Sequence, residues 1–168
     1  MPVTVRFITG EDAEAFLQLC LQLDSESDFM LLEPGERRTT VEEQRLHIHD
    51  ILSTENQAIF VAEHQGKLVG YLAALGGRYR RNRHVAQVIV AVLQPFWRQG
   101  IGTGLFTEME RWAWQHGLHR LELTVITHNE AALALYRKMG FQIEGTRRHA
   151  LLIDGVYVDE YYMAKLLS

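Results

Sequence analysis

Cysteine and proline are scarce in this chain of 168 residues, which contains one cysteine, Cys20, and three prolines. A single cysteine excludes an internal disulfide and is typical of proteins kept in a reducing compartment. No apolar run approaches the roughly 20 residues that a membrane-spanning helix needs. The first residues, Met1–Ile8, are strand-like and lack the basic and apolar regions of a signal peptide. We therefore expect a cytoplasmic protein.

Positive charge is also in short supply, because 21 acidic residues outnumber 17 lysines and arginines and leave a formal net charge of −4. This balance argues against a generic nucleic-acid-binding protein. Internal repeats, low-complexity tracts and Pro- or Ser-rich linkers are absent as well. The apolar fraction of 47% suffices for a sizeable core. One domain over residues 1–168 is the expected organisation.

The most informative segment runs from Val88 to Gly104. A β-branched run ends at Pro95, a short basic and aromatic stretch follows, and glycines then stand at positions 100, 102 and 104. After Gly104 the apolar residues recur at helical spacing. A glycine-rich turn at a helix start presents backbone N–H groups to an anion, and the helix dipole adds partial positive charge there. The segment therefore predicts a phosphate-binding turn between a strand and a helix.

Three kinds of phosphate-binding turn compete for this segment. A P-loop requires Lys-Ser or Lys-Thr after the last glycine, where this chain has Leu105 and Phe106. A dinucleotide-binding turn requires its third glycine at position 105, although Glu122 is spaced acceptably for the ribose-binding acid. A third kind of phosphate-binding turn is identified by its glycines together with a second motif later in the chain.

Hydrophobic periodicity and turn residues predict a mixed α/β fold. Its elements follow the order β-α-α-β-β-β-α-β-α-β-β, which is a mixed sheet with helices on its faces. Asn129 is suited to cap the last helix, and Asp154-Gly155 is a two-residue hairpin signal. The expected strands cover residues 3–8, 58–63, 67–75, 85–93, 121–126, 141–153 and 156–166, and the expected helices begin near residues 9, 39, 104 and 129.

Two signatures in this order resemble those of the GCN5-related N-acetyltransferases, the GNAT superfamily. The segment Gln99–Gly104 fits the pattern Gln/Arg-x-x-Gly-x-Gly/Ala, and Asn129–Phe141 is similar to the second signature, an asparagine, a short helix, Leu-Tyr and Gly-Phe. The element order matches over nearly the whole chain, so the resemblance implies a mixed, mostly antiparallel sheet with helices on both faces. The tail Arg147–Met163 loosely resembles the branch that acetylates ribosomal-protein N-termini and polyamines.

The resemblance implies a site for acetyl-CoA as cosubstrate, with its pantetheine arm along the backbone of Val90, Val92 and Leu93. The strand Leu121–Ile126 is expected to splay away and leave a cleft. Asn129 is expected to contact the pantetheine or pyrophosphate region, to cap its helix, or to do both. The pyrophosphate is expected on backbone N–H groups of Arg98, Gln99, Gly100, Ile101, Gly102, Thr103 and Gly104.

Tyr136 is the expected catalytic residue, because a neutral phenol of pKa about 10 can return a proton to a thiolate whose conjugate acid has a pKa of about 8.5. Spacing alone also fits a core role for Tyr136, and the family motif favours catalysis. Glu122 is the expected general base, since it shares a strand face with Thr124, where some relatives carry glutamate. His84, Gln87 and a water chain remain alternatives.

The acidic loop from Asp24 to Glu36 is expected to cover the acceptor site, with Glu33 and Glu36 as substrate contacts. The basic run Arg78–Arg83 has three interpretations: a solvated hairpin tip, a contact for a CoA phosphate, or an RNA-facing patch. His47 and His49 stand two apart on a predicted helix, so they point to different sides and predict no metal site.

The resemblance thus predicts a cytoplasmic enzyme that transfers the acetyl group of acetyl-CoA directly to a primary amine, with no acyl-enzyme on Cys20. The acceptor would be a small molecule or a peptide: a protein N-terminus, a polyamine or a small amine. Because family members are often dimers, the resemblance also admits a homodimer. A non-catalytic acyl-CoA-binding module and a nucleotide-binding regulatory domain are the rival hypotheses.

Overall fold

The computed structural model describes residues 2–167 and has the element order that the sequence predicts. Its strands are β1 (Thr4–Phe7), β2 (Gln57–His64), β3 (Lys67–Gly76), β4 (Val85–Val92), β5 (Arg120–Ile126), β6 (Gln142–Ile153) and β7 (Val156–Leu166). The helices are α1 (Ala13–Glu26), α2 (Val41–Leu52), α3 (Ile101–Gln115) and α4 (Glu130–Lys138), with short 3₁₀ turns η1 (Gly10–Asp12) and η2 (Gln94–Phe96). The predicted mixed α/β fold is confirmed.

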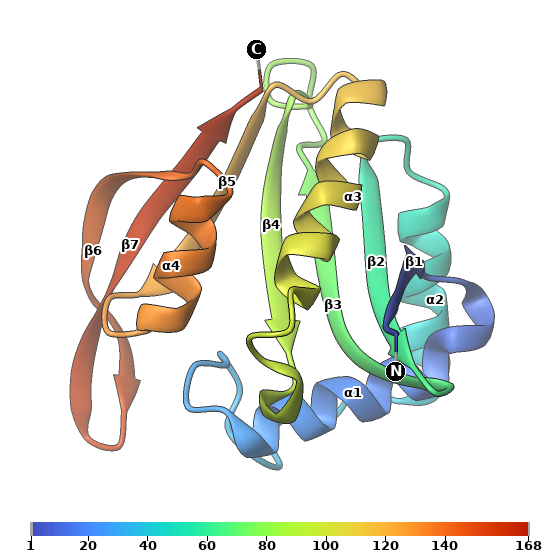
Figure 1. Ribbon diagram of the computed structural model, residues 1–168, viewed down its shortest axis with the longest axis horizontal. Helices are drawn as coiled ribbons and strands as arrows, with labels where there is room; N and C mark the ends of the chain where they lie inside the picture. The colour runs from blue at the N-terminus through green and yellow to red at the C-terminus, as the bar shows by residue number, and fades with distance from the viewer. Residues whose placement is uncertain (1, 168) are drawn as a thin grey trace.

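The sheet has seven strands in the order β1-β2-β3-β4-β5-β7-β6 (Figure 1). Its neighbouring strands are antiparallel except for β4 and β5, which run parallel. These two strands pair only where Val85–Gln87 lies beside residues 120–122. Beyond Gln87 they separate, as the resemblance implies, and this separation positions the functional site.

Helices cover both faces of the sheet. Phe16 of α1 packs edge-to-face against Tyr71 of β3 at 5.0 Å between ring centroids, and Trp112 of α3 packs against Phe60 of β2 at 6.2 Å. Phe60 is in register with Leu72, the neighbour of Tyr71 along β3. Successive residues of a strand point to opposite faces, so α1 and α3 lie on opposite sides. In Figure 1, α4 lies on the same side as α3.

Local signals account for the ends of these elements. The Thr40 hydroxyl accepts a hydrogen bond from the Glu43 N–H, and the Asn129 side chain accepts one from the Ala132 N–H, so both residues cap helices as their residue types favour. Asp154 and Gly155 have φ of 49° and 77°, the left-handed pair that a tight two-residue hairpin turn requires. The predicted hairpin and the Asn129 cap are confirmed.

The basic loop Arg78–Arg83 joins β3 to β4 at the end of the sheet where β4 and β5 pair. Its side chains are exposed. The glycine turn follows the other end of β4, roughly 26 Å away for eight residues at about 3.3 Å each. Phosphates bound at the glycine turn therefore lie out of reach of this loop, and its exposure fits a solvated hairpin tip; the RNA-facing alternative stays a prediction.

Candidate functional site

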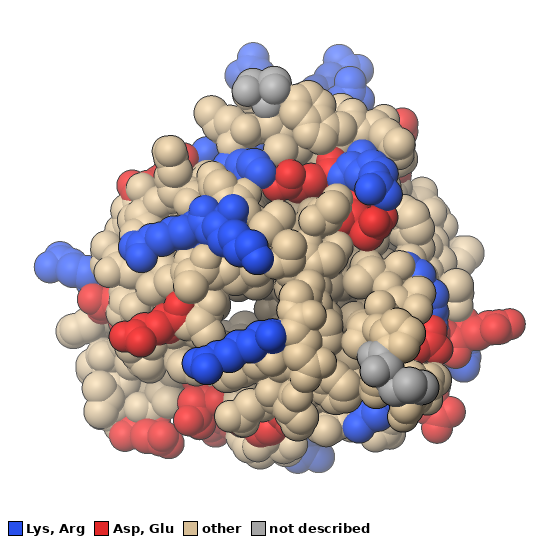
Figure 2. Space-filling model, in the orientation of Figure 1, with Lys and Arg blue, Asp and Glu red and all other residues tan. Residues whose placement is uncertain are grey.

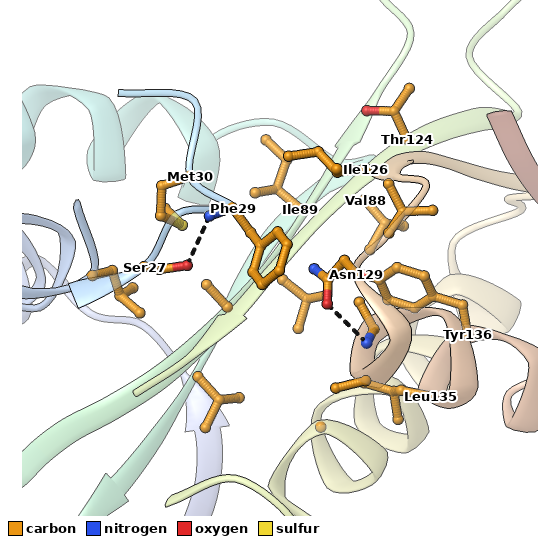
Figure 3. A pocket seen from close by; sticks show the side chains of 18 of the residues that line it. Ser27, Phe29, Met30, Val88, Ile89, Thr124, Ile126, Asn129, Leu135 and Tyr136 are labelled. Atoms are coloured by element: carbon orange, nitrogen blue, oxygen red, sulfur yellow. Dashed lines mark hydrogen bonds between the residues drawn. The ribbon is translucent and has the colours of Figure 1, made fainter. Parts of the chain in front are cut away.

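A cavity of about 940 Å³ opens where β4 and β5 separate. Its walls come from segments far apart in the sequence: the loop between α1 and α2, strands β3 to β5, the turn before α3, helix α4 and the β6–β7 hairpin. Figure 3 shows Phe29 and Met30 of the loop on one side and Asn129, Leu135 and Tyr136 on the other. Phe29 also contacts the His128 ring at 5.6 Å, so the loop reaches across the gap to the start of α4.

Part of the β4 backbone faces this cavity. Gly77 N–H donates to the Val85 carbonyl and Leu93 N–H to the Val69 carbonyl, so the odd-numbered residues of β4 bond to β3. In an antiparallel ladder the alternate residues then point the other way, which places the backbone groups of Val90 and Val92 toward the gap. The Val92 carbonyl accepts a hydrogen bond of 2.6 Å from the Trp97 Nε1. The N–H of Val92 is therefore the backbone group of this residue that stays open toward the gap.

Leu93 does not share this arrangement, which corrects the expectation that it binds pantetheine. Its N–H donates to Val69 at 2.9 Å, its carbonyl accepts from the Phe96 N–H at 2.9 Å, and its side chain is buried. Both backbone groups are therefore already used within the protein.

The glycine turn is exposed and rich in free donors. Among the described residues, no hydrogen bond is made by the N–H groups of residues 98–103, and residues 98–100 are exposed. Arg98 and Gly100 adopt left-handed φ of 62° and 79°, a turn geometry of the kind in which successive N–H groups form a concave anion site. Gly104 differs, since its N–H donates to the Gly100 carbonyl at 2.9 Å as the first bond of α3. The open donors thus span residues 98–103 rather than 98–104.

The glycines of the turn serve different purposes. Gly100 supplies the left-handed conformation, where a side chain would be strained. A Cβ at Gly102 would lie 2.7 Å from Cδ2 of Leu135, so this glycine allows α3 and α4 to pack closely. A Cβ at Gly104 would meet Val5 at 3.5 Å, on a side of the helix away from the cavity.

Two basic side chains line this end of the cavity: that of Lys138, which the sequence interpretation did not assign, and that of Arg98, which was expected there for its backbone N–H. Lys138, at the end of α4, donates from Nζ to the Thr103 hydroxyl at 3.2 Å, and Arg98 belongs to the turn itself. Figure 2 shows Lys and Arg side chains on both rims of the hollow between α4 and the turn. Lys138 follows the Leu-Tyr of the second signature, which is the sequence signal that could have identified it.

Tyr136 lies on α4 with its ring packed edge-to-face against Phe106 at 5.8 Å. Its side chain is 7% exposed and lines the cavity. Within residues 2–167 its hydroxyl makes no hydrogen bond, and the one fully buried side-chain polar atom without a partner is His64 Nδ1, so the Tyr136 hydroxyl is not sealed in the core. Burial raises the pKa of this phenol well above its usual value, which keeps it protonated near neutral pH.

Asn129 combines two of the expected features. Its side-chain oxygen accepts from the Ala132 N–H at 3.2 Å, and the residue also lines the cavity. Capping uses the oxygen, so the amide NH₂ is the group that Asn129 can offer to a ligand.

Glu122 does not reach the cavity, which corrects the expectation of a general base at this position. It stands beside Gln87 at the last paired position of β4 and β5, and Arg120 binds it at 2.9 Å. Arg120 also pairs with Glu144 at 2.6 Å, so Glu122 belongs to a surface ion-pair cluster. Of the other candidates, Gln87 lines the cavity and His84 does not.

Glu33 and Glu36 also lie outside the cavity, contrary to their expected role as substrate contacts. Glu36 Oε1 accepts from the Glu33 N–H at 3.0 Å, and both residues are exposed in a self-contained turn. The acid that shapes this loop is Asp24, which is 2% exposed and binds Arg37 through two hydrogen bonds of 2.6 and 3.1 Å. Arg37 in turn lines the cavity beside Tyr71.

One carboxylate does line the cavity, and it comes from the C-terminal hairpin. Among the described residues, Glu160 of β7 is the sole acidic residue on the wall, and Arg147 of β6 stands opposite it in register. The sequence does not identify either residue individually. Which face of this hairpin meets the cavity depends on how the hairpin pairs with β5 in the folded sheet.

Within residues 2–167 there is no group of three or more His, Cys, Asp or Glu side chains arranged to hold a metal ion. The helices described there are also too short or too polar to cross a membrane.

Comparison with known proteins agrees with this geometry. The family model of the acetyltransferase (GNAT) family matches residues 21–141. The L-amino acid N-acetyltransferase AaaT of Escherichia coli K12 is 36% identical over 105 residues, which is 60% of this chain and 63% of that protein. The spermidine N(1)-acetyltransferase of the same organism is 32% identical over 116 residues, which is 66% of this chain and 57% of that protein. The chain thus spans about three fifths of these curated relatives.

A crystal structure of a GNAT-family acetyltransferase from Streptococcus pneumoniae superposes with a TM-score of 0.95 at 31% identity, covering 99% of this chain and 100% of that one. The ribosomal-protein-alanine N-acetyltransferase of Brucella melitensis superposes with a TM-score of 0.85 at 25% identity, covering 98% and 99% of the two chains. Together with the family model, these matches show that the chain belongs to the acetyltransferase (GNAT) family.

Proposed function

We propose that the protein transfers the acetyl group of acetyl-CoA directly to a primary amine. The observation that carries this proposal is the row of open N–H groups at residues 98–103, located at a helix N-terminus beside the gap between β4 and β5. Such a row suits a diphosphate, because each N–H donates to an anionic oxygen and the helix dipole favours negative charge. Arg98 and Lys138 add two positive charges at the same end of the cavity.

The gap beside β4 suits the extended arm that follows the diphosphate in CoA. The backbone groups of Val90 and the N–H of Val92 face the gap without a strand partner on that side. A polar chain with amides can bond to such a strand edge as an additional strand does. Asn129 offers its amide NH₂ from the opposite wall.

Tyr136 supports the chemical step. Acetyl-CoA supplies a thioester carbon that an amine nitrogen attacks, with cleavage of the C–S bond and release of CoA thiolate. We infer that the protonated phenol of Tyr136, which lines the cavity, donates a hydrogen bond to the departing sulfur and passes a proton to it, and that the phenolate regains a proton from the water that takes up the amine proton. Burial raises the pKa of the Cys20 thiol to about 11, and Cys20 lies in the core, so an acyl-enzyme on this cysteine is not part of the proposal.

We assign the amine acceptor to the end of the cavity away from the glycine turn, where Phe29 and Met30 of the α1–α2 loop form part of the wall. Relatives named as acetyltransferases of L-amino acids, spermidine and ribosomal-protein alanine support an amine as acceptor without selecting among these classes. Polar groups of Tyr71, Gln87 and Thr124 lie on the cavity wall, where they can hold a water chain that removes the proton lost by the amine.

The proposal is tested by measuring thiol release from acetyl-CoA over a panel of amines, together with calorimetric titration of the protein with CoA, ATP and NAD. We expect turnover with at least one amine and tight binding of CoA alone. Tight CoA binding without turnover on any amine would favour the non-catalytic acyl-CoA module instead. Preferential binding of ATP or NAD would overturn the assignment of the turn.

A further inference from the structure

The register of the sheet places Arg147 and Glu160 on the acceptor side. Glu160 is in register with Ile126 of β5 on one side and with Arg147 of β6 on the other. Residues in register share a face, and Ile126 shares its face with Thr124. Thr124 and Ile126 line the cavity beside Ile89 (Figure 3).

The same face is the one that α1 covers. Gln87 is in register with Glu122 of β5, and Ala91, four residues after Gln87, is in register with Tyr71 of β3. Since Tyr71 packs against Phe16 of α1, this face is opposite to the one that carries α3. Arg147 and Glu160 therefore meet a ligand from the side of the α1–α2 loop, away from the turn that holds the open N–H groups.

The two side chains are paired only loosely. The Arg147 Nη1 lies 3.5 Å from the Glu160 Oε1, at the limit of a hydrogen bond. The Arg147 side chain is 53% exposed, whereas that of Glu160 is 12% exposed and held in the wall. A long contact of this kind leaves both groups free to bind a ligand that carries the opposite charges.

The other charged groups of the cavity are already assigned. Asp24 satisfies Arg37 with two hydrogen bonds, and Arg98 and Lys138 belong to the end near the glycine turn. The acceptor end thus offers one carboxylate beside one guanidinium. A polyamine needs several carboxylates and would be repelled by Arg147, and the N-terminal residue of a peptide, which carries the acceptor amine, has an amide in place of its α-carboxylate.

We propose that the acceptor is a free α-amino acid, with its ammonium group facing Glu160 before proton loss and its carboxylate bound by Arg147. This inference rests on the proposed acetyl transfer and deepens it. In an α-amino acid one carbon separates the two charged groups, which matches the adjacent guanidinium and carboxylate of the wall. Phe29, Met30 and Leu151 line the same region and favour an apolar side chain on the acceptor.

The experiment compares acceptors that differ in one group. Rates of thiol release from acetyl-CoA are measured with the twenty L-amino acids, with spermidine and with a short peptide, and then with the amide of the best amino acid. We expect an amino acid to be the best acceptor and its amide to lose about ten- to a hundredfold in kcat/KM, the range of one hydrogen bond between charged groups. An amide, peptide or polyamine that reacts as well as the amino acid would overturn the inference and leave acetyl transfer standing.

Single substitutions then test which side chains bind the acceptor. Arg147→Gln is expected to raise KM for the amino acid about ten- to a hundredfold and to bring the amino acid and its amide to similar kcat/KM. Arg148→Gln removes the same charge one residue away, from an exposed position outside the cavity, and should leave the amino acid-to-amide ratio unchanged. An unchanged ratio in Arg147→Gln would overturn the assignment of Arg147.

Glu160→Gln tests the ammonium contact, with Glu55→Gln as an exposed control outside the cavity. We expect Glu160→Gln to raise KM for the amino acid at neutral pH while its affinity for CoA is retained, and retained CoA affinity also reports an intact fold. If Glu160→Gln does not fold, the Arg147→Gln ratio decides the question alone, because Arg147 is half exposed and its loss leaves the core intact. If no amine reacts and CoA does not bind, the proposed function itself has failed.

Discussion

The two ends of the cavity are built in opposite ways. At one end, the contiguous residues 98–103 present open backbone N–H groups from a single turn. At the other end, the wall is assembled from the α1–α2 loop, three strands and the β6–β7 hairpin, and its polar groups are side chains. Backbone donors persist when the other side chains of the turn change, provided that Gly100 and Gly102 are kept, whereas an assembled wall changes with each substitution. Under the proposed function, binding of the acyl donor and choice of the acceptor can therefore vary independently.

The variant Tyr136→Phe probes the middle of the cavity, between these two ends, and has the largest expected effect. Turnover should fall roughly ten- to a thousandfold, because the phenol that we propose as the proton donor to sulfur is lost. CoA affinity, measured by calorimetry, should be almost unchanged, since the turn and β4 are intact. Tyr157→Phe removes an exposed hydroxyl of β7 and serves as the control. Full activity in Tyr136→Phe would remove Tyr136 from the mechanism.

The variant Asp24→Asn perturbs the acceptor end alone. It leaves the guanidinium of Arg37 without its buried partner, and we expect about 3 kcal/mol lower free energy of unfolding, at the low end for a buried pair because Arg37 is partly exposed. KM for the acceptor should rise, while CoA affinity is retained.

The matched control for Asp24→Asn is Glu42→Gln, which breaks the exposed pair with Arg45 and should cost less than about 1 kcal/mol in urea unfolding. Equal destabilisation by the two variants would show that the buried pair does not hold the α1–α2 loop in place.

The variant Gly102→Val acts, through packing, on the end of the cavity that residues 98–103 form, the anion end. Its side chain would press on Leu135 and displace α4, at a cost of about 1–3 kcal/mol in stability and a parallel loss of CoA affinity. The double variant Gly102→Val with Leu135→Ala should recover part of both quantities. If CoA affinity stays low while stability recovers, the new side chain obstructs the phosphates directly. Gly10→Ala, at an open position, is the control.

The variant Lys138→Ala should have the smallest effect, about 1 kcal/mol in CoA affinity or roughly fivefold, because its ammonium group is exposed to solvent. The effect should shrink as salt rises from low to physiological ionic strength. Arg137→Ala removes a neighbouring charge that does not line the cavity. Similar losses of CoA affinity in both variants would indicate a general electrostatic attraction of CoA by positive charge rather than a direct contact between Lys138 and a phosphate.

Much of the anion end could be predicted because its signals are local. Glycines at positions 100, 102 and 104 after a β-branched strand indicate the turn, and helical spacing after Asn129 places Tyr136 on α4. That Gly102 makes room for Leu135 of α4 could be seen only in the structure, because a neighbour on another helix decides what a Cβ there would meet. The prediction for Leu93 was wrong for a similar reason, because its N–H is used by β3.

The acceptor end could not be predicted from such signals. Positions along the chain predict roles for Glu122, Glu33 and Glu36, but all three residues lie outside the cavity. Strand periodicity shows that Glu122 and Thr124 share a face, but not that β4 and β5 part immediately after Glu122. Arg147 and Glu160 come from a hairpin whose register with β5 forms only in the folded sheet.

The chain's own residues, taken in order, determined the succession of strands and helices, the glycine turn and the tyrosine on α4, because φ preferences, caps and hydrophobic period act over a few neighbours. The folded sheet alone decided which backbone groups of β4 stay open and which carboxylate faces the cavity. Those properties depend on where two parallel strands stop pairing, and that point is set by contacts between segments distant in the sequence.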